Sequence, residues 1–149
     1  MHTAKTWEQF HADILKLAEK LRNHKPGIIA PCMLGGLIPG AIIAKQLGIT
    51  DVRPIDIERE GEERRLAYDI QGSIQGKKVL ILEDDLPTGK GPALIKKQFE
   101  QRGAEVKIAA VYVTPESRGV TDFYVEVCER PPDYPWKKFH EGNRLRKYI

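Results

Sequence analysis

The sequence predicts an α/β domain built on a mainly parallel, open sheet with helices on both faces. Three short apolar stretches, at residues 27–32, 77–84 and 106–113, are typical of buried strands. Segments with helical periodicity separate them, and glycines end those segments. Because parallel neighbours need a crossover connection, strands that alternate with helices indicate a parallel sheet.

Composition favours one domain. The 149 residues, 41% of them hydrophobic, suffice for a single compact core. The formal charge of +3 is spread over both signs, so we do not expect nucleic acid as a partner. Cys32 and Cys128 match no metal-ligand spacing, which favours reduced thiols in a cytoplasmic protein. No apolar run approaches about 18 residues, so we expect neither secretion nor a membrane span.

The first half of the chain begins with a helix after Thr6, which forms a capping-box pattern with Gln9. The apolar residues of this helix recur at helical spacing: Trp7, Phe10, Ile14, Leu17 and Leu21. Residues 27–32 (GIIAPC) predict a buried strand, and residues 35–49 (GGLIPGAIIAKQLGI) predict a glycine turn and a second helix. Residues 51–58 (DVRPIDIE) predict another strand.

The second half opens with the polar residues 59–76, which predict a mobile excursion with strand character around residues 66–70. Residues 77–84 (KKVLILED) give the strongest strand pattern and lead into an acidic turn. A helix at about 92–102 follows and ends at Gly103. Two further strands are predicted at residues 106–113 (VKIAAVYV) and 122–128 (DFYVEVC).

The acidic turn and the loop after it predict a site for a sugar phosphate. In open α/β sheets ligands bind beyond the carboxyl ends of the strands, where Glu83, Asp84 and Asp85 follow. Residues 88–91 (TGKG) then enter a helix N-terminus, whose free N–H groups and dipole favour a phosphate. Carboxylates repel phosphate but bond to ribose hydroxyls. An acidic helix cap with an ordinary glycine turn is the simpler alternative, but the unbroken order of strand, acids, Thr-Gly and helix favours the ligand site.

These residues resemble the signature of the type I phosphoribosyltransferases. That signature is an acid pair, three variable residues and a Thr-Gly loop, matched here in order by Glu83, Asp84, Asp85, Leu86, Pro87, Thr88, Gly89, Lys90 and Gly91. Residues 27–49 resemble the first strand, pyrophosphate loop and helix of the xanthine-guanine and hypoxanthine purine-salvage branch. Residues 133–139 (DYPWKKF) resemble the C-terminal hood of that branch.

The resemblance implies the type I phosphoribosyltransferase fold over residues 1–149, with a flexible loop at about 59–76 and a hood at about 129–149. It implies a pentosyltransferase of nucleotide metabolism that moves the 5-phosphoribosyl group of 5-phosphoribosyl 1-diphosphate to a nucleobase, with a purine in first place, and releases pyrophosphate. Mg²⁺ is expected to be held mainly by the donor, with no direct protein ligand. A homo-oligomer is expected.

The resemblance also implies roles for the site residues. Glu83 and Asp84 are the catalytic pair and hold the ribose, while residues 88–91 hold the 5′-phosphate. The pyrophosphate meets backbone N–H groups of three residues, near a non-proline cis peptide: Leu34, Gly35 and Gly36. The base would stack on the hood residues Tyr134 and Trp136, although packing of the hood against the core is the alternative. Candidate contacts from the flexible loop are Arg64, Arg65 and Tyr68.

Four positions depart from the purine-salvage pattern. Leu34 stands where a Lys or Arg usually precedes the Gly-Gly, so a positive charge is missing beside the pyrophosphate. Pro87 stands where the oxopurine branch has an Asp that handles the purine proton, and its side chain accepts no proton. Thr114 replaces a Lys that reads the purine oxygen, and Gly91 removes a hydroxyl from the phosphate loop.

The sequence therefore leaves two functions open. The first is a phosphoribosyltransferase with an unusual acceptor. The alternative is a non-catalytic member of the family that binds or senses a phosphoribosyl ligand or a nucleotide. Such a regulator could also bind nucleic acid through the basic tail at residues 137–147, although a solvated tail or a subunit contact explains those charges more simply.

Overall fold

The computed structural model describes residues 4–136, which form a parallel sheet covered by helices on both faces, as the sequence predicts. The strand order is β1-β4-β5-β6, and every neighbouring pair is parallel. The four strands are β1 (Ile28–Pro31), β4 (Lys78–Leu86), β5 (Glu105–Val113) and β6 (Phe123–Val127). The carboxyl ends of all four therefore meet at one edge of the sheet.

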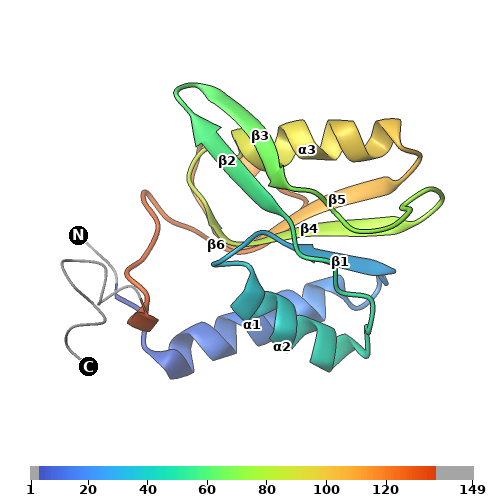
Figure 1. The fold of residues 1–149 in the computed structure, drawn as a ribbon. Coiled ribbons are helices and arrows are strands. Elements are labelled where there is room, and N and C mark those ends of the chain that lie inside the picture. Colours follow the sequence, from blue (N-terminus) through green and yellow to red (C-terminus); the bar gives the residue numbers. More distant parts are fainter. Residues whose placement is uncertain (1–3, 137–149) are drawn as a thin grey trace, which may run out of the picture.

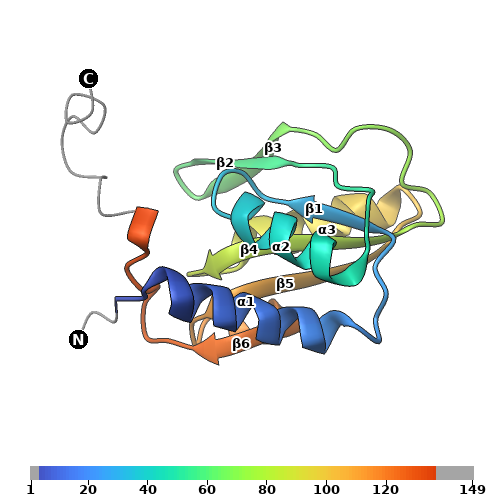
Figure 2. The same cartoon turned by 90° about the horizontal axis from the view of Figure 1, so that it is seen from below.

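Three α-helices in the described residues complete the layers: α1 (Trp7–Leu21), α2 (Leu37–Leu47) and α3 (Lys90–Gln101). Figure 1 shows α3 over one face of the sheet, with α1 and α2 under the other. Seen from below in Figure 2, α1 and α2 lie side by side across that lower face. Within the described part of the chain, no helix combines the length and the apolar character needed to cross a membrane.

Helix α1 starts where the capping box predicts. The Thr6 Oγ1 accepts from the Gln9 backbone N–H at 3.1 Å, and the Gln9 side chain accepts from the Thr6 N–H at 2.9 Å. The predicted apolar face is buried from Phe10 onward. Trp7 is the exception, with 54% of its surface exposed, because it lies in the first turn, where its ring meets Trp136 at 5.4 Å.

Alternation along β4 divides the core into two layers. Val79 and Ile81 pack on the α3 side with Phe99, while Leu80 and Leu82 pack on the α1–α2 side. All four β4 side chains are completely buried. A strand buried on both faces needs this continuous apolar run, which explains why residues 77–84 give the clearest strand pattern.

The acidic residues are not in a turn. Strand β4 runs to Leu86, so Glu83, Asp84 and Asp85 belong to the strand rather than to the turn that the sequence predicts. Their backbone continues to pair with β5, with Glu83 opposite Ala110 and Asp85 opposite Tyr112. Ladder hydrogen bonds use backbone groups only, so a change from apolar to acidic side chains does not end a strand.

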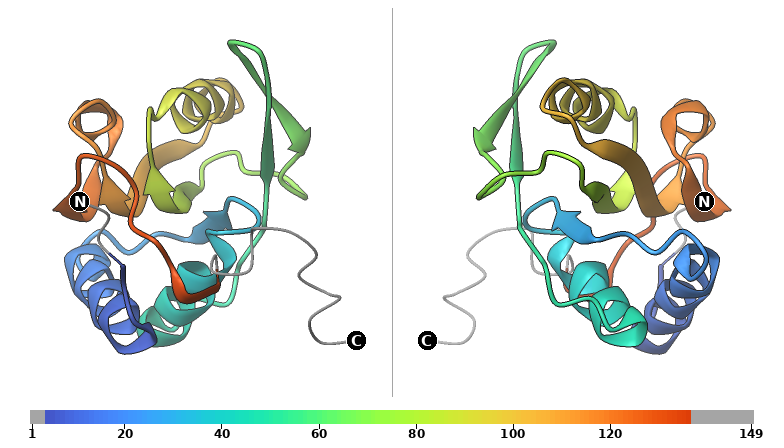
Figure 3. Two further views of the ribbon diagram at one scale, coloured as in Figure 1. Left: turned by 90° about the vertical axis from the view of Figure 1, so that its left-hand side faces the viewer. Right: turned by 90° about the vertical axis from the view of Figure 1, so that its right-hand side faces the viewer.

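A separate antiparallel hairpin replaces most of the excursion expected at residues 59–76. Strand β2 (Asp56–Glu60) pairs with β3 (Glu63–Tyr68), so ordered strand begins earlier than the predicted 66–70. The strand expected at 51–58 is likewise displaced, because Val52 and Ile55 make only single parallel bridges to β1 before β2 begins. Figure 3 shows the hairpin standing beside α3. The side chains of this hairpin are mainly exposed, which explains why its sequence is polar.

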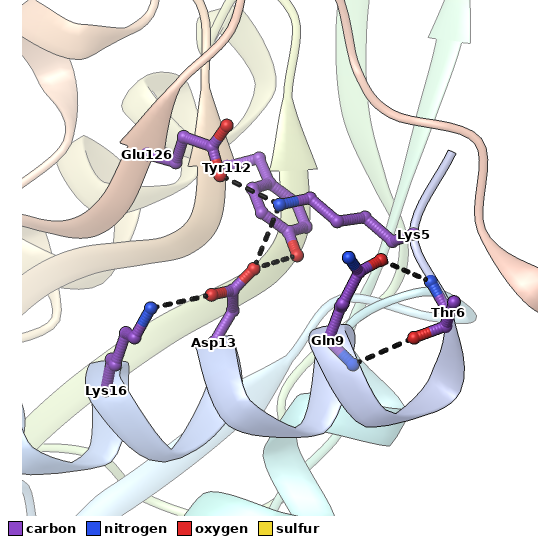
Figure 4. A network of polar contacts seen from close by, with 7 residues as sticks. All are labelled: Lys5, Thr6, Gln9, Asp13, Lys16, Tyr112 and Glu126. Carbon is purple, nitrogen blue, oxygen red and sulfur yellow. Dashed lines mark hydrogen bonds and ion pairs between the residues drawn. The ribbon is translucent and has the colours of Figure 1, made fainter. Parts of the chain in front are cut away.

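Asp13 anchors the N-terminal segment to the sheet. Its buried carboxylate accepts from the Tyr112 hydroxyl at 2.7 Å, from Lys5 at 3.2 Å and from Lys16 at 3.3 Å (Figure 4). Burial alone would raise the pKa of Asp13, but the hydrogen bonds from Tyr112 and Lys5 outweigh it and lower the pKa. Lys5 also donates to Glu126 at 2.9 Å, which ties the segment to β6.

Replacing Phe99 by Ala tests the α3 layer. Phe99 is completely buried, so Phe99→Ala should lower the free energy of unfolding by about 3–5 kcal/mol through lost burial and a cavity. Leu94→Ala is the matched control on the same helix, because Leu94 is 36% exposed, and it should cost no more than about 1 kcal/mol. Denaturant unfolding measures both, and equal losses would contradict the layer assignment.

Candidate functional site

Seven of the predicted site residues line one cavity at the carboxyl edge of the sheet, whereas Leu34, Gly35, Gly36, Asp84, Lys90, Tyr134 and Trp136 are outside its lining. A cavity of about 230 Å³ opens there between the end of β4, the start of α3 and the β2–β3 hairpin. Its lining joins acidic, loop and hairpin residues: Ile57, Arg59, Arg64, Glu83, Asp85, Leu86, Pro87, Thr88, Gly89, Gly91 and Pro92. Anionic and cationic side chains therefore face one cavity, as a ligand with hydroxyl and phosphate groups requires.

The loop at residues 32–36 covers the β1 side of β4 beyond its last paired residue. Cys32 N donates to Leu82 O at 2.9 Å, and Gly36 N donates to Cys32 O at 2.8 Å. A Cβ on Gly36 would lie 2.4 Å from Leu82 O, so only glycine fits this approach. The Met33–Leu34 peptide is cis, next to the bond where the sequence predicts one. Leu34 itself is 77% exposed.

Asp84 packs directly against this loop. The Asp84 side chain is buried, and its Oδ1 accepts from the Asp85 backbone N–H at 2.7 Å. A Cβ on Gly35 would come within 2.4 Å of Asp84 Oδ2, so the glycine leaves room for the carboxylate. The Gly-Gly pair and the acid pair, 48 residues apart in sequence from Gly35 to Glu83, thus pack against each other, and Glu83 of this group lines the cavity.

Thr88, Gly89 and Gly91 of the loop at residues 88–91 also line the cavity. Gly89 has φ 75°, a left-handed conformation, and a Cβ there would meet Val120 Cγ2 at 2.4 Å. Helix α3 begins at Lys90, so the Lys90 and Gly91 N–H groups have no partner within the helix, and Pro92 has no N–H to satisfy. The Lys90 N–H donates a hydrogen bond to the Thr88 hydroxyl at 3.3 Å. This geometry suits an anion at the helix N-terminus.

The hairpin leans over the start of α3. The side chains of Ile57 and Arg64 lie next to Gly91, and Lys90 forms an ion pair with Glu62 at 3.5 Å. Arg64, a candidate loop contact, lines the cavity, whereas Arg65 forms an ion pair with Glu58 at 2.6 Å and is absent from the cavity lining. Sequence analysis missed Arg59, which also lines the cavity. Identifying Arg59 would have required the alternation of side chains along the strands of a hairpin.

Two hydroxyls fix the backbone where β4 ends. Thr114 Oγ1 donates to Pro87 O at 2.6 Å, and Ser117 Oγ donates to Leu86 O. Thr114 is thus a buried structural residue at the position where the purine-salvage pattern has a Lys. Ser117 was not anticipated, although two hydroxyl residues spaced three apart after a strand are typical of a local turn motif.

The hood residues pack into the core rather than offering open faces. Tyr134 is completely buried, stacks on Trp136 with ring centroids 4.6 Å apart, and meets Phe10 edge-on at 5.3 Å. This burial contradicts the expected base-stacking role of Tyr134, whose ring is covered by protein. Trp136 is half-buried in the same cluster, which agrees with the packing alternative. The basic tail at 137–147 lies outside the described residues.

Burial also decides the chemistry of Cys32. The thiol is buried at the start of the loop at residues 32–36, and burial followed by the nearby Glu83 charge raises its pKa well above the usual value. Such a thiol is unreactive as a nucleophile. In residues 4–136, no group of three or more Cys, His, Asp or Glu side chains could hold a metal.

A parallel α/β sheet with carboxylates and a glycine-containing helix N-terminus at its carboxyl edge is typical of proteins that bind nucleotides or sugar phosphates. The model of the phosphoribosyl transferase domain family matches residues 5–146. The chain belongs to this family, and it is a transferase of the pentosyltransferase class.

Individual relatives agree with this assignment. Xanthine-guanine phosphoribosyltransferase of Nitratidesulfovibrio vulgaris is 32% identical over 125 residues, covering 80% of this chain and 74% of the relative. The crystal structure of a purine phosphoribosyltransferase from Pyrococcus horikoshii is 34% identical, with a TM-score of 0.81 over 90% of this chain and 92% of that one. Helicobacter pylori xanthine-guanine-hypoxanthine phosphoribosyltransferase shares the fold, with a TM-score of 0.76 at 14% identity over 91% and 93% of the two chains.

Gly36→Ala tests the close approach of the glycine loop to β4. The new Cβ would collide with backbone atoms of Leu82 and Cys32, so unfolding free energy should fall by about 1–3 kcal/mol. Gly119→Ala is the control, since nothing lies within 4 Å of its Cβ, and it should change stability by no more than about 0.5 kcal/mol. Thermal or denaturant unfolding gives both values, and an undisturbed Gly36→Ala protein would refute the packing.

Proposed function

We propose that this protein transfers the 5-phosphoribosyl group of 5-phosphoribosyl 1-diphosphate to a purine base and releases pyrophosphate. The observation that carries the proposal is the shared cavity: Glu83 on β4 and Gly89 before α3 both line it. A ribose 5-phosphate has hydroxyls at one end and a phosphate at the other, which matches this division of charge.

The carboxylates and the start of α3 have distinct tasks in this proposal. The carboxylates of Glu83 and Asp84 accept hydrogen bonds from the ribose hydroxyls, and their charge favours a sugar ring that becomes cationic at C1. The first-turn N–H groups of α3, from Gly89 onward, bind the 5′-phosphate. Arg59 and Arg64 add positive charge to the same cavity. Binding at both ends fixes C1 relative to the base.

Departure of pyrophosphate depends on the loop at residues 32–36. The Gly36 N–H is bonded to Cys32 O, so the Leu34 and Gly35 N–H groups of this loop are the ones that would meet the leaving group. Leu34 contributes no charge, and the cations of the cavity lining are the hairpin arginines Arg59 and Arg64. Mg²⁺, bound to phosphate oxygens of the donor, supplies neutralisation of the leaving charge, and a metal carried by the substrate needs no protein cage.

A turnover assay tests the proposal. Purified protein, 5-phosphoribosyl 1-diphosphate, Mg²⁺ and a mixture of nucleobases should give a nucleoside monophosphate, detected by mass spectrometry. The double variant Glu83→Gln with Asp84→Asn should lower kcat/KM by about 10²-fold or more, because two charge-assisted hydrogen bonds to the ribose are lost.

Glu105→Gln is the control, because this exposed carboxylate begins β5 at the opposite edge of the sheet. Its kcat/KM should match that of the unmodified protein. Binding of the donor without any nucleoside monophosphate would instead support the non-catalytic alternative. Unchanged donor binding in the double variant would exclude Glu83 and Asp84 as ribose ligands.

A further inference from the structure

The loop at residues 88–91 and the start of α3 offer a phosphate few hydrogen-bond donors of their own. Pro92 has no N–H, and the Lys90 N–H is bonded to the Thr88 hydroxyl at 3.3 Å. Gly91 adds no side-chain donor. The oxygens of a phosphate dianion accept several hydrogen bonds, so a phosphate at this loop needs donors from another part of the chain.

The β2–β3 hairpin brings two arginines to this loop. Arg59 and Arg64 are paired across the hairpin, so they share one of its faces, and both line the cavity. The next pair on that face is Ile57 with Leu66, and these two side chains pack against the core. Two apolar residues thus anchor the face of the hairpin that carries the two arginines.

Gly91 allows the hairpin to approach the start of α3 closely. A Cβ on Gly91 would lie 3.0 Å from Ile57 Cγ2 and 3.9 Å from Arg64 Cδ, so a larger residue here would press on Ile57. The glycine that gives the loop no side-chain donor is therefore also the residue that allows Arg64 to lie beside the loop.

The segment that follows the hairpin is held in place as well. Arg102, at the end of α3, forms two hydrogen bonds with the Asp69 carboxylate, at 3.0 and 2.8 Å. Arg53 donates to the backbone carbonyls of Gln71 and Ser73 at 2.9 and 2.8 Å. These contacts fix the base of the hairpin relative to α3, so the arginines are already beside the cavity before a ligand binds.

The charges of the two arginines are poorly balanced by the protein. Like charges directly opposite each other across a hairpin repel. Arg64 forms no ion pair within residues 4–136, and its Nη1 group donates to the backbone carbonyls of Glu62 and Glu63 at 3.0 and 3.3 Å. Arg59 is 3.9 Å from the Glu62 carboxylate, but that side chain is 81% exposed, so the ion pair is weak. An anion bound by both arginines would remove their repulsion.

We infer that Arg59 and Arg64 bind the 5′-phosphate of the ligand together with the loop at residues 88–91; the inference rests on the ribose 5-phosphate site proposed above. The planar guanidinium groups donate to phosphate oxygens in pairs, which a lysine ammonium group does not. The ligand class that they select is a sugar 5-phosphate, because the same sugar without its phosphate would leave the two arginines unpaired. The hairpin is thus part of the phosphate site, and its cations leave the pyrophosphate to the loop at residues 32–36.

Titration calorimetry with ribose 5-phosphate tests the inference, because this probe has one phosphate and no leaving group. Arg64→Gln should weaken binding by about 10- to 100-fold, since hydrogen bonds between two charged groups are lost. Arg59→Gln should weaken binding as well. Arg64→Lys should recover only part of the affinity, because a single ammonium group replaces the guanidinium fork.

Arg65→Gln is the matched control. Arg65 is the next residue of β3, but it belongs to the other face of the hairpin, where it is paired with Glu58 at 2.6 Å. This substitution changes the net charge as much as Arg64→Gln does, but it should change the affinity for ribose 5-phosphate by no more than about twofold. Added salt should weaken binding to the unmodified protein more than to Arg64→Gln, because salt screens the charge that this variant lacks.

Equal affinities of Arg64→Gln and the unmodified protein for ribose 5-phosphate would overturn the inference. Equal losses in Arg64→Gln and Arg65→Gln, or no binding of the probe by the unmodified protein, would also overturn it. The turnover assay is a separate readout. A protein that binds the probe with the expected dependence on Arg64, but forms no nucleoside monophosphate, would overturn the transferase proposal and leave the arginine site intact.

Discussion

The backbone pairing of β4 is the constraint on which the rest of the structure depends. This strand pairs with β5 from Lys78 to Leu86, but with β1 only as far as Leu82. Beyond Leu82, the β1 side of the strand is covered by the glycine loop at residues 32–36 instead of by another strand. The backbone of the acidic residues is therefore held from both sides, and Glu83 and Asp85 still line the cavity. Such fixed groups are the kind of preorganisation that a binding site needs.

Glycines let these separate parts approach one another. Gly35 leaves room for the Asp84 carboxylate, and Gly36 leaves room for the Leu82 carbonyl. Gly89, which has a left-handed conformation, leaves room for Val120. Each contact joins segments that are distant in sequence. The carboxylates of β4 and the N-terminus of α3 thus lie at one cavity. In the proposed function, the hydroxyl groups of the ligand bind the carboxylates and its phosphate binds the helix N-terminus.

Polar contacts from distant segments complete the site. Thr114 and Ser117 bind the carbonyls at the end of β4, and Lys90 joins the hairpin through Glu62. Tyr134 holds the C-terminal segment against the core through its ring contacts with Phe10, Tyr112 and Trp136.

The sequence by itself determined the local features of this protein. The Thr6–Gln9 capping box, the glycine that ends α2 at Gly48 and the apolar runs of the parallel sheet depend on neighbouring residues, so they could be predicted. The ordered motif from Glu83 to Gly91 likewise predicted a site, and most of its residues line the cavity. Only the tertiary structure decided the β2–β3 pairing, the continuation of β4 through its acids, the direction of Arg59 and Arg64, and the burial of Tyr134. These features depend on backbone and side-chain contacts between residues far apart in sequence, and local propensity carries no information about such partners.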